Sequence, residues 1–400
     1  MWLPRRPQRP LLPRAATWAA LSRVTFRLFS DFRCTLLEAM EQLNSNKKER
    51  SNLMRKTVTL LVSLGMLALA AILMTGTFSA AAGLAPGASG YRVIKTVPVG
   101  GEGFWDYLSV DSEGRRLYIS HGTHVQVMDI DSYTLVGDIP DTQGVHGIAL
   151  APELGRGFTS NGRSNTVTIF DLKTLMTVGT VSTGTNPDCI VYDGVTKRVF
   201  TMNGRSNNST AINATDGTVA GTVDLGGRPE FGAADGKGSI YVNLEDKSEL
   251  VQLDAQSLKV LNTWPLAPCE EPSGLAMDLK NRRLFAGCHN QMMAVVDADT
   301  GKVVATPAIG RGVDANRFDP ETNYAFSSNG EGTLTVVHED SPDKFTVVEN
   351  VPTKPSARTM ALDEKTHNIF LAAADFEPPA PGERRGRMKP GSFVILVVGR

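Results

Sequence analysis

Short segments of alternating apolar and polar residues, separated by turn-forming residues, fill the chain from about residue 91 to its end. One kind of segment, a strand-like stretch with a central aromatic residue, recurs along the chain, as in RRLYIS, GRGFTS and KRVFTM. These aromatics lie 40, 42, 41, 44, 41 and 44 residues apart and are Tyr118, Phe158, Phe200, Tyr241, Phe285, Phe326 and Phe370. Such a period, with β-branched alternation and Asp, Asn and Gly at the joints, holds four short strands and is too short for a strand–helix–strand unit. The pattern predicts seven copies of one β unit.

Seven four-stranded antiparallel units in series predict an all-β fold, a seven-bladed β-propeller spanning 91–400. The seventh unit stops after its third strand at Arg400, and a matching outer strand occurs in YRVIKTVPVG, at 91–100. We expect this N-terminal strand to pair with the C-terminal strand at about 392–398, because that pairing closes the ring and removes exposed strand edges. The alternative is a six-bladed ring with an additional tail.

The repeat motifs NPD before an apolar residue, RVF, SNTVTIFDL and GKVVAT are the most distinctive parts of these units. On these motifs the chain resembles the YVTN-repeat β-propellers of the YncE-like kind, a family of exported bacterial and archaeal proteins, over about 91–400. The resemblance implies a propeller and export. It implies no particular reaction, because propellers carry unrelated functions.

The first 82 residues differ from the rest. Residues 1–53 contain Pro and Arg clusters such as PRRPQRP and no periodic core pattern, which indicates a disordered extension or a gene start placed too early. Residues 54–82 combine Arg55 and Lys56 with an apolar stretch and the small residues SAAAG, the pattern of a secretory signal peptide cleaved near Ala82. The alternative is a membrane anchor through 58–74, which approaches spanning length. We therefore expect a periplasmic or extracellular protein, membrane-anchored if it is not cleaved.

The charge of the propeller segment limits its partners. Beyond residue 82 there are 29 Lys+Arg (41 minus 12) and 38 Asp+Glu (42 minus 4), a net charge of −9. A negative surface repels phosphate backbones, so nucleic-acid binding is disfavoured. The motifs GxSxG, HExxH, Walker A and CxxCH are absent.

Three cysteines lie in the propeller segment. Cys269 precedes the fifth inner strand and Cys288 ends the aromatic strand of the same unit, so a disulfide between them is expected in an oxidising compartment. Cys189 lies within an inner strand, where a buried free thiol is expected.

Candidate ligand-binding residues emerge from the register of the repeat. Twelve positions before each aromatic, or eleven in the fourth unit, the innermost strand begins. The residues there are Asp106, His146, Asp188, Glu230, Ser273, Asp314 and Arg358. The residues just before them are apolar or small, and include Trp105. Because the seven positions are equivalent, we expect a ring of polar side chains at one mouth of the central channel.

The chemistry of this ring leaves two interpretations open. Converging carboxylates repel each other unless a cation, a shared proton or Arg358 compensates them. Oxygen ligands with one imidazole suit Ca²⁺, Mg²⁺ or Zn²⁺, and the candidate metal ligands are Asp106, His146, Asp188, Glu230 and Asp314. Alternatively, these residues only cap strand starts in a water-filled channel.

The pentapeptide NGRSN occurs twice, at 161–165 and 203–207, as the turn after the aromatic strand. We expect Asn and Gly to supply residues that tolerate positive φ. Arg163 and Arg205 should stand beside the ring, where they could pair with its carboxylates or hold an anionic ligand. Turns on the same face also carry His121, His124, Glu245, Asp246 and His289, and for any single histidine or arginine of these turns a solvated position is expected. The last unit has a Pro- and Arg-rich insertion at 376–391, which could be a lid, a partner contact or disordered.

Three functions fit these patterns. The first is an exported, monomeric binding propeller that takes a small molecule, a metal ion or a protein partner at its channel mouth. The second is a metal-assisted hydrolase of lactonase type, in which the ion polarises a carbonyl and His146 or a carboxylate acts as base. The third, redox work with a noncovalent haem or quinone, lacks a dedicated ligand set.

Overall fold

The structure is a computed structural model that describes residues 89–101, 103–379 and 386–400. The predicted extension at 1–53 and the predicted signal peptide or anchor at 54–82 lie outside the described residues. In the part of the chain that the structure describes, no helix combines the length and the apolar character needed to span a bilayer.

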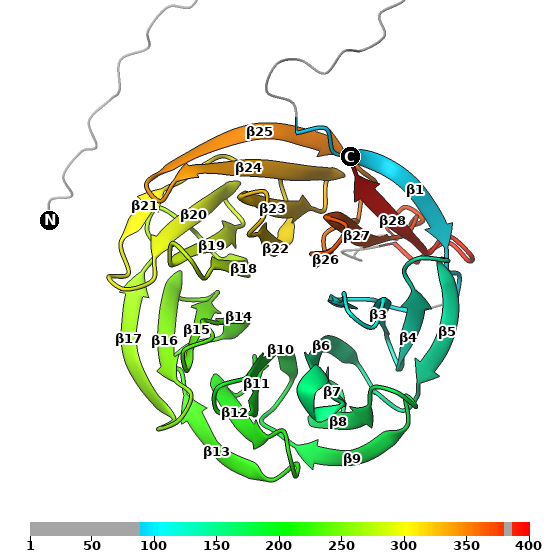
Figure 1. Ribbon diagram of the computed structural model, residues 1–400, viewed down its shortest axis with the longest axis horizontal. Coiled ribbons are helices and arrows are strands. Elements are labelled where there is room, and N and C mark those ends of the chain that lie inside the picture. Colours follow the sequence, from blue (N-terminus) through cyan, green and yellow to red (C-terminus); the bar gives the residue numbers. More distant parts are fainter. Residues whose placement is uncertain (1–88, 102, 380–385) are drawn as a thin grey trace, which may run out of the picture. The chain divides into compact units, whose positions relative to one another are not determined.

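Seven four-stranded antiparallel sheets follow one another around a common axis, with the first strand of each blade nearest that axis (Figure 1). Blade 1 contains β2 (Leu108–Asp111), β3 (Arg116–His121), β4 (His124–Asp129) and β5 (Thr134–Ile139). Blade 2 contains β6 (Val145–Ala151), the 3₁₀ turn η1 (Pro152–Leu154), β7 (Arg156–Asn161), β8 (Thr166–Asp171) and β9 (Thr177–Ser182). Blade 3 contains β10 (Pro187–Asp193), β11 (Arg198–Asn203), β12 (Asn208–Asn213) and β13 (Val219–Asp224).

The other four blades repeat this order. Blade 4 contains β14 (Pro229–Ala234), β15 (Ser239–Leu244), β16 (Glu249–Asp254) and β17 (Lys259–Pro265). Blade 5 contains β18 (Pro272–Asp278), β19 (Arg283–Cys288), β20 (Met292–Asp297) and β21 (Val303–Ala305). Blade 6 contains β22 (Val313–Asp319), β23 (Tyr324–Asn329), β24 (Thr333–Ser341) and β25 (Lys344–Pro352). Blade 7 contains β26 (Met360–Asp363), β27 (Asn368–Ala373), β28 (Val394–Gly399) and β1 (Arg92–Pro98).

The predicted seven-bladed fold is confirmed, and the six-bladed alternative is wrong. The ring closes where β1 pairs antiparallel with β28, with Val97 opposite Ile395 and Arg92 opposite Gly399 (Figure 1). The first and last strands of the propeller thereby complete one blade, so β28 has no free edge.

The repeating aromatics are buried in the core of the propeller. All seven lie in the second strand of their blade and are at most 1% exposed. Both faces of a blade are covered by neighbouring blades, so apolar residues are needed on both faces of its strands. This is why one aromatic per unit marks the period so clearly.

In the two NGRSN turns, the residues that adopt positive φ are not those at the start of the motif. Their first residues, Asn161 and Asn203, are buried and hold the following strand through hydrogen bonds of their side-chain amides. The Nδ2 atom of Asn161 donates to Thr168 Oγ1 at 2.9 Å, and that of Asn203 donates to Thr210 Oγ1 at 3.0 Å. Positive φ occurs instead at the fifth letters, Asn165 (φ 56°) and Asn207 (φ 55°). Asn tolerates this region, so the turn motif combines a buried anchor with a left-handed residue.

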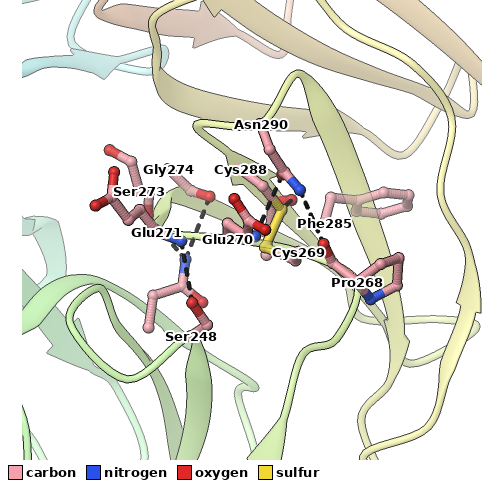
Figure 2. The surroundings of a disulfide bond; sticks show 12 residues. Ser248, Pro268, Cys269, Glu270, Glu271, Ser273, Gly274, Phe285, Cys288 and Asn290 are labelled. Atoms are coloured by element: carbon pink, nitrogen blue, oxygen red, sulfur yellow. Dashed lines mark hydrogen bonds between the residues drawn. A yellow bond between two sulfur atoms is a disulfide. The ribbon is translucent and has the colours of Figure 1, made fainter. Parts of the chain in front are cut away.

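The sulfur atoms of Cys269 and Cys288 are bonded at 2.07 Å (Figure 2). The bond ties the loop before β18 to the end of β19, next to Glu270 and Glu271 (Figure 2). Cys189 is a buried free thiol.

Replacing Val97 with Asp should destabilise the protein strongly. Val97 is 6% exposed and packs in the core cluster that contains Phe393 and Ile395. An unpaired buried carboxylate there should lower the free energy of unfolding by about 3 kcal/mol or more. The matched control is Thr96→Asp on the exposed side of the same strand, expected within about 0.5 kcal/mol of wild type. Denaturant unfolding measures both, and equal effects would contradict the closure described here.

Candidate functional site

The seven predicted ring residues lie at one level of the propeller, at the start of the inner strands. Five are the second residue of their strand, and Asp106 and Arg358 lie two residues before β2 and β26. In each of the five strands the pairing with the next strand is interrupted at the ring residue, as between Val145 and Ile148 and between Pro187 and Ile190. Such β-bulges turn a side chain out of the ladder. The bulges therefore free the ring side chains to line the mouth of the channel.

A chain of charged contacts links five of these residues across five blades. The guanidinium of Arg358 contacts Asp314 through Nη1 and lies with Nη2 3.5 Å from Asp106 Oδ1. On its other side, Asp106 Oδ2 lies 2.6 Å from His146 Nδ1. The same Nδ1 atom lies 3.6 Å from Asp188 Oδ1. Acid and base alternate along the chain, so each cation lies between two carboxylates.

The other ring positions contribute less directly. Ser273 Oγ donates a hydrogen bond of 3.1 Å to Asp314. Glu230 makes no ion pair with another described residue. Trp105 is buried and packs on Phe393 and Phe376, with ring centroids 5.1 Å and 5.8 Å apart.

Protonation changes the charge of this ring. Burial lowers the pKa of His146, but its hydrogen bond to Asp106 and the charges of Asp188 and Asp106 outweigh burial and raise the pKa to about 9. Burial raises the pKa of Asp188 to about 7, with a further contribution from Asp106. Burial and the neighbouring carboxylates also raise the pKa of Glu230 well above its ordinary value. At neutral pH His146 is therefore cationic, and two of the four carboxyl groups are wholly or partly neutral.

The metal ligands predicted from the sequence come together only in part. Single donor atoms of Asp106, His146 and Asp188 lie within 4.8 Å of one another, so these three residues could hold an ion. Asp314 is already held by Arg358 and Ser273. An ion would have to displace the proton that His146 Nδ1 shares with Asp106.

A cavity of about 430 Å³ lies above this chain of contacts, on the side of blades 2 and 3. Its charged lining residues are His146, Arg163 and Arg205, with Phe104 on one side and no carboxylate. The amides of Asn165 and Asn186 complete its polar wall. Both arginines are exposed, and neither makes an ion pair with a described residue. The predicted proximity of Arg163 and Arg205 to His146 is thus found, whereas pairing with the ring is not.

A larger recess of about 1030 Å³ lies on the other side of Phe104. It is lined by Phe104, Trp105 and Arg358, together with Phe376 and other residues of the insertion. The two ends of that insertion meet, because Phe376 pairs with Met388 in an antiparallel bridge. Residues 380–385 lie outside the described residues.

His121 differs from the solvated position expected of it. The side chain is 1% exposed and packs on the ring of Phe393, with centroids 4.8 Å apart. Burial lowers its pKa to about 4, so it is neutral. It contributes to packing and not to the surface of the mouth.

The remaining polar turns pair locally. His124 Nε2 lies 3.7 Å from Asp138, and Glu245 pairs with Arg228 at 2.6 Å. Asp246 accepts the Arg228 backbone N–H at 2.7 Å. His289 Nδ1 lies 3.1 Å from Glu271 Oε2, and Glu245, Glu271 and His289 form a second group of three possible ligands near the disulfide.

The sequence did not point to several residues that shape the mouth. Phe104 borders both cavities although it is 47% exposed. Tyr107 and Phe231 directly follow ring residues, and their rings meet edge to face at 5.0 Å. They come from blades 1 and 4, three blades apart, so this contact reaches across the channel below the ring. The signal in the sequence that could have found them is that each directly follows a ring residue.

No family model matches the chain, and no curated protein matches it. Among solved structures, the U3-55K structure superposes with a TM-score of 0.64 at 10% identity, over 76% of this chain and 98% of that one. The WD40 repeats of RRP9 give 0.64 at 10% identity, over 78% and 98%. Hydrazine synthase of Kuenenia stuttgartiensis gives 0.60 at 13% identity, over 68% and 93%. At these identities the likeness establishes the propeller fold alone.

The imidazole of His146 should titrate with a midpoint of about 9 in NMR spectra of the folded protein. Because this pKa is raised above the unfolded value, the stabilisation from the Asp106 contact is present below about pH 6.5 and is lost as the pH rises through about 9. Asp106→Asn should move the midpoint down toward 6.5. A wild-type midpoint at or below 6.5 would contradict the ion pair.

Proposed function

We propose that this propeller binds a small anionic molecule at its channel mouth, without catalysis. The observation that carries the proposal is the 430 Å³ cavity, whose charged lining consists of His146, Arg163 and Arg205. A volume of this size suits a small organic ligand. Planar guanidinium groups bind carboxylate or phosphate oxygens in pairs, and Phe104 offers an apolar contact for the rest of the ligand.

The protonation of the ring supports an anion in preference to a cation. Arg358 and His146 compensate Asp106 and Asp314 within the chain of contacts. The raised pKa values of Asp188 and Glu230 remove further negative charge. The two unpaired arginines then dominate the potential above His146, because opposite charges nearby are already paired.

We further propose that the protein is an exported, monomeric member of the YVTN-repeat kind. The repeat motifs and the segment 54–82 support this part of the proposal. In that setting the mouth would meet ligands of the periplasm or the medium.

The double variant Arg163→Ala/Arg205→Ala should lose ligand binding. A panel of mono- and dicarboxylates and sugar phosphates, screened by shifts of the melting temperature at constant ionic strength, should identify the ligand. The variant should weaken its binding at least about tenfold, because charge-assisted hydrogen bonds are lost. The matched control is Arg311→Ala, an exposed arginine at the same end of blade 6 that lines neither cavity.

Affinity for this ligand should also fall as the pH rises. Asp188 becomes negatively charged as the pH rises through about 7, and His146 loses its positive charge as the pH rises through about 9. Absence of any shift across the panel, or shifts that the double variant keeps, would overturn the proposed site.

A second candidate is a metal-assisted hydrolase, favoured by the donors of Asp106, His146 and Asp188 within 4.8 Å. A bound divalent ion would polarise a substrate carbonyl. Titration of the metal-free protein with Zn²⁺ or Ca²⁺ tests this candidate. Binding of one ion per chain that releases protons and is lost in Asp188→Ala would favour the hydrolase over the anion site. Protons are released because the ion and the proton compete for His146 Nδ1.

A further inference from the structure

A separate cavity of about 330 Å³ lies along the inner strands, below the ring. Its lining includes Tyr107, Cys189, Phe231, Leu275 and Arg317. Arg317 comes from β22, three residues after the ring residue Asp314, and is the one charged residue of this lining. None of the residues that line the mouth cavity lines this one.

The guanidinium of Arg317 has few partners. Its Nη1 donates to the backbone oxygen of Asn316 at 2.8 Å, and its Cζ lies 5.5 Å from the ring centroid of Phe231. A guanidinium has five N–H donors, and this hydrogen bond is the one that its side chain makes with the described residues. Among the ion pairs of the described residues, none involves Arg317.

The ionisable groups that face Arg317 from other elements are uncharged. Burial raises the pKa of Cys189 to about 12. Burial and the nearby ring carboxyls raise the pKa of Tyr107 well above its ordinary value. No carboxylate lines the cavity around Arg317, and burial lowers the pKa of its guanidinium. An arginine stays charged in proteins, so the cavity holds a positive charge without a counter-charge, which is unfavourable.

We propose that Arg317 is the centre of a second anion site inside the channel, for a carboxylate or a small inorganic oxoanion. Two oxygens of one anion match the paired N–H groups of the guanidinium. Tyr107 lines the same cavity, and its hydroxyl group is a further donor. The site does not depend on the mouth cavity, because the two share no lining residue.

Sulfate is the probe for this site. Isothermal titration calorimetry of the full chain with sulfate, in a buffer of monovalent anions, should show binding that Arg317→Gln weakens at least about tenfold, since charge-assisted hydrogen bonds are lost. The mouth variant Arg163→Ala/Arg205→Ala should keep it. Sulfate binding that survives Arg317→Gln and disappears in the mouth variant would overturn the channel site while supporting the mouth site.

Cys189 provides an independent readout, because it lines the same cavity and has a free thiol. Sulfate should slow the alkylation of Cys189 by a neutral thiol reagent, followed on the Cys189 peptide by mass spectrometry. This slowing by sulfate should vanish in Arg317→Gln. It should persist in part in Arg317→Lys, which keeps the positive charge and is the control for an effect of substitution on folding. Alkylation of Cys189 that is measurable in the wild type and equally fast with and without sulfate would overturn the proposal.

Discussion

The pairing of β1 with β28 is the interaction on which the rest of the structure depends. It brings the N-terminal strand of the propeller to its C-terminal strand, so that blades 7 and 1 become neighbours. Other contacts cross the same seam: Arg115 pairs with the buried Asp363 at 2.8 Å, and Thr359 donates to the Asp106 backbone oxygen at 2.7 Å. The contact of Arg358 with Asp106 crosses it too. The charged chain at the mouth exists only in the closed ring.

Closure also explains how a chain with a net negative propeller can offer a cationic pocket. Residues from five blades meet at the mouth, and their carboxylates are either paired with Arg358 and His146 or have raised pKa values. The arginines of the two NGRSN turns stand above this compensated layer without carboxylate partners in the cavity lining. The net charge of the propeller segment and the charge of the residues that line this cavity therefore differ in sign.

The sequence predicted the architecture because a propeller is built from near neighbours. A period set by one buried aromatic per unit is a local pattern, and it gave both the seven blades and the register of the ring. It did not give the partners within the ring. The contact of Arg358 with Asp106 joins the two ends of the propeller, and the position of His146 depends on a β-bulge. Burial of His121 was missed because Phe393, which covers it, belongs to another blade. The hydrogen bonds of Asn161 lie within its own blade and were missed because the motif was interpreted as a solvated turn. Arg317 was hidden among the alternating residues of an ordinary inner strand.

The central claim, that positive charge faces the ligand at the mouth, is tested most directly by locating an ion there. Crystals soaked in bromide can be measured at the bromine absorption edge, which identifies bound anions by their anomalous scattering. The account predicts a bromide between His146, Arg163 and Arg205. Manganese soaked in a parallel experiment and found between Asp106, His146 and Asp188, with no bromide in the cavity, would contradict it.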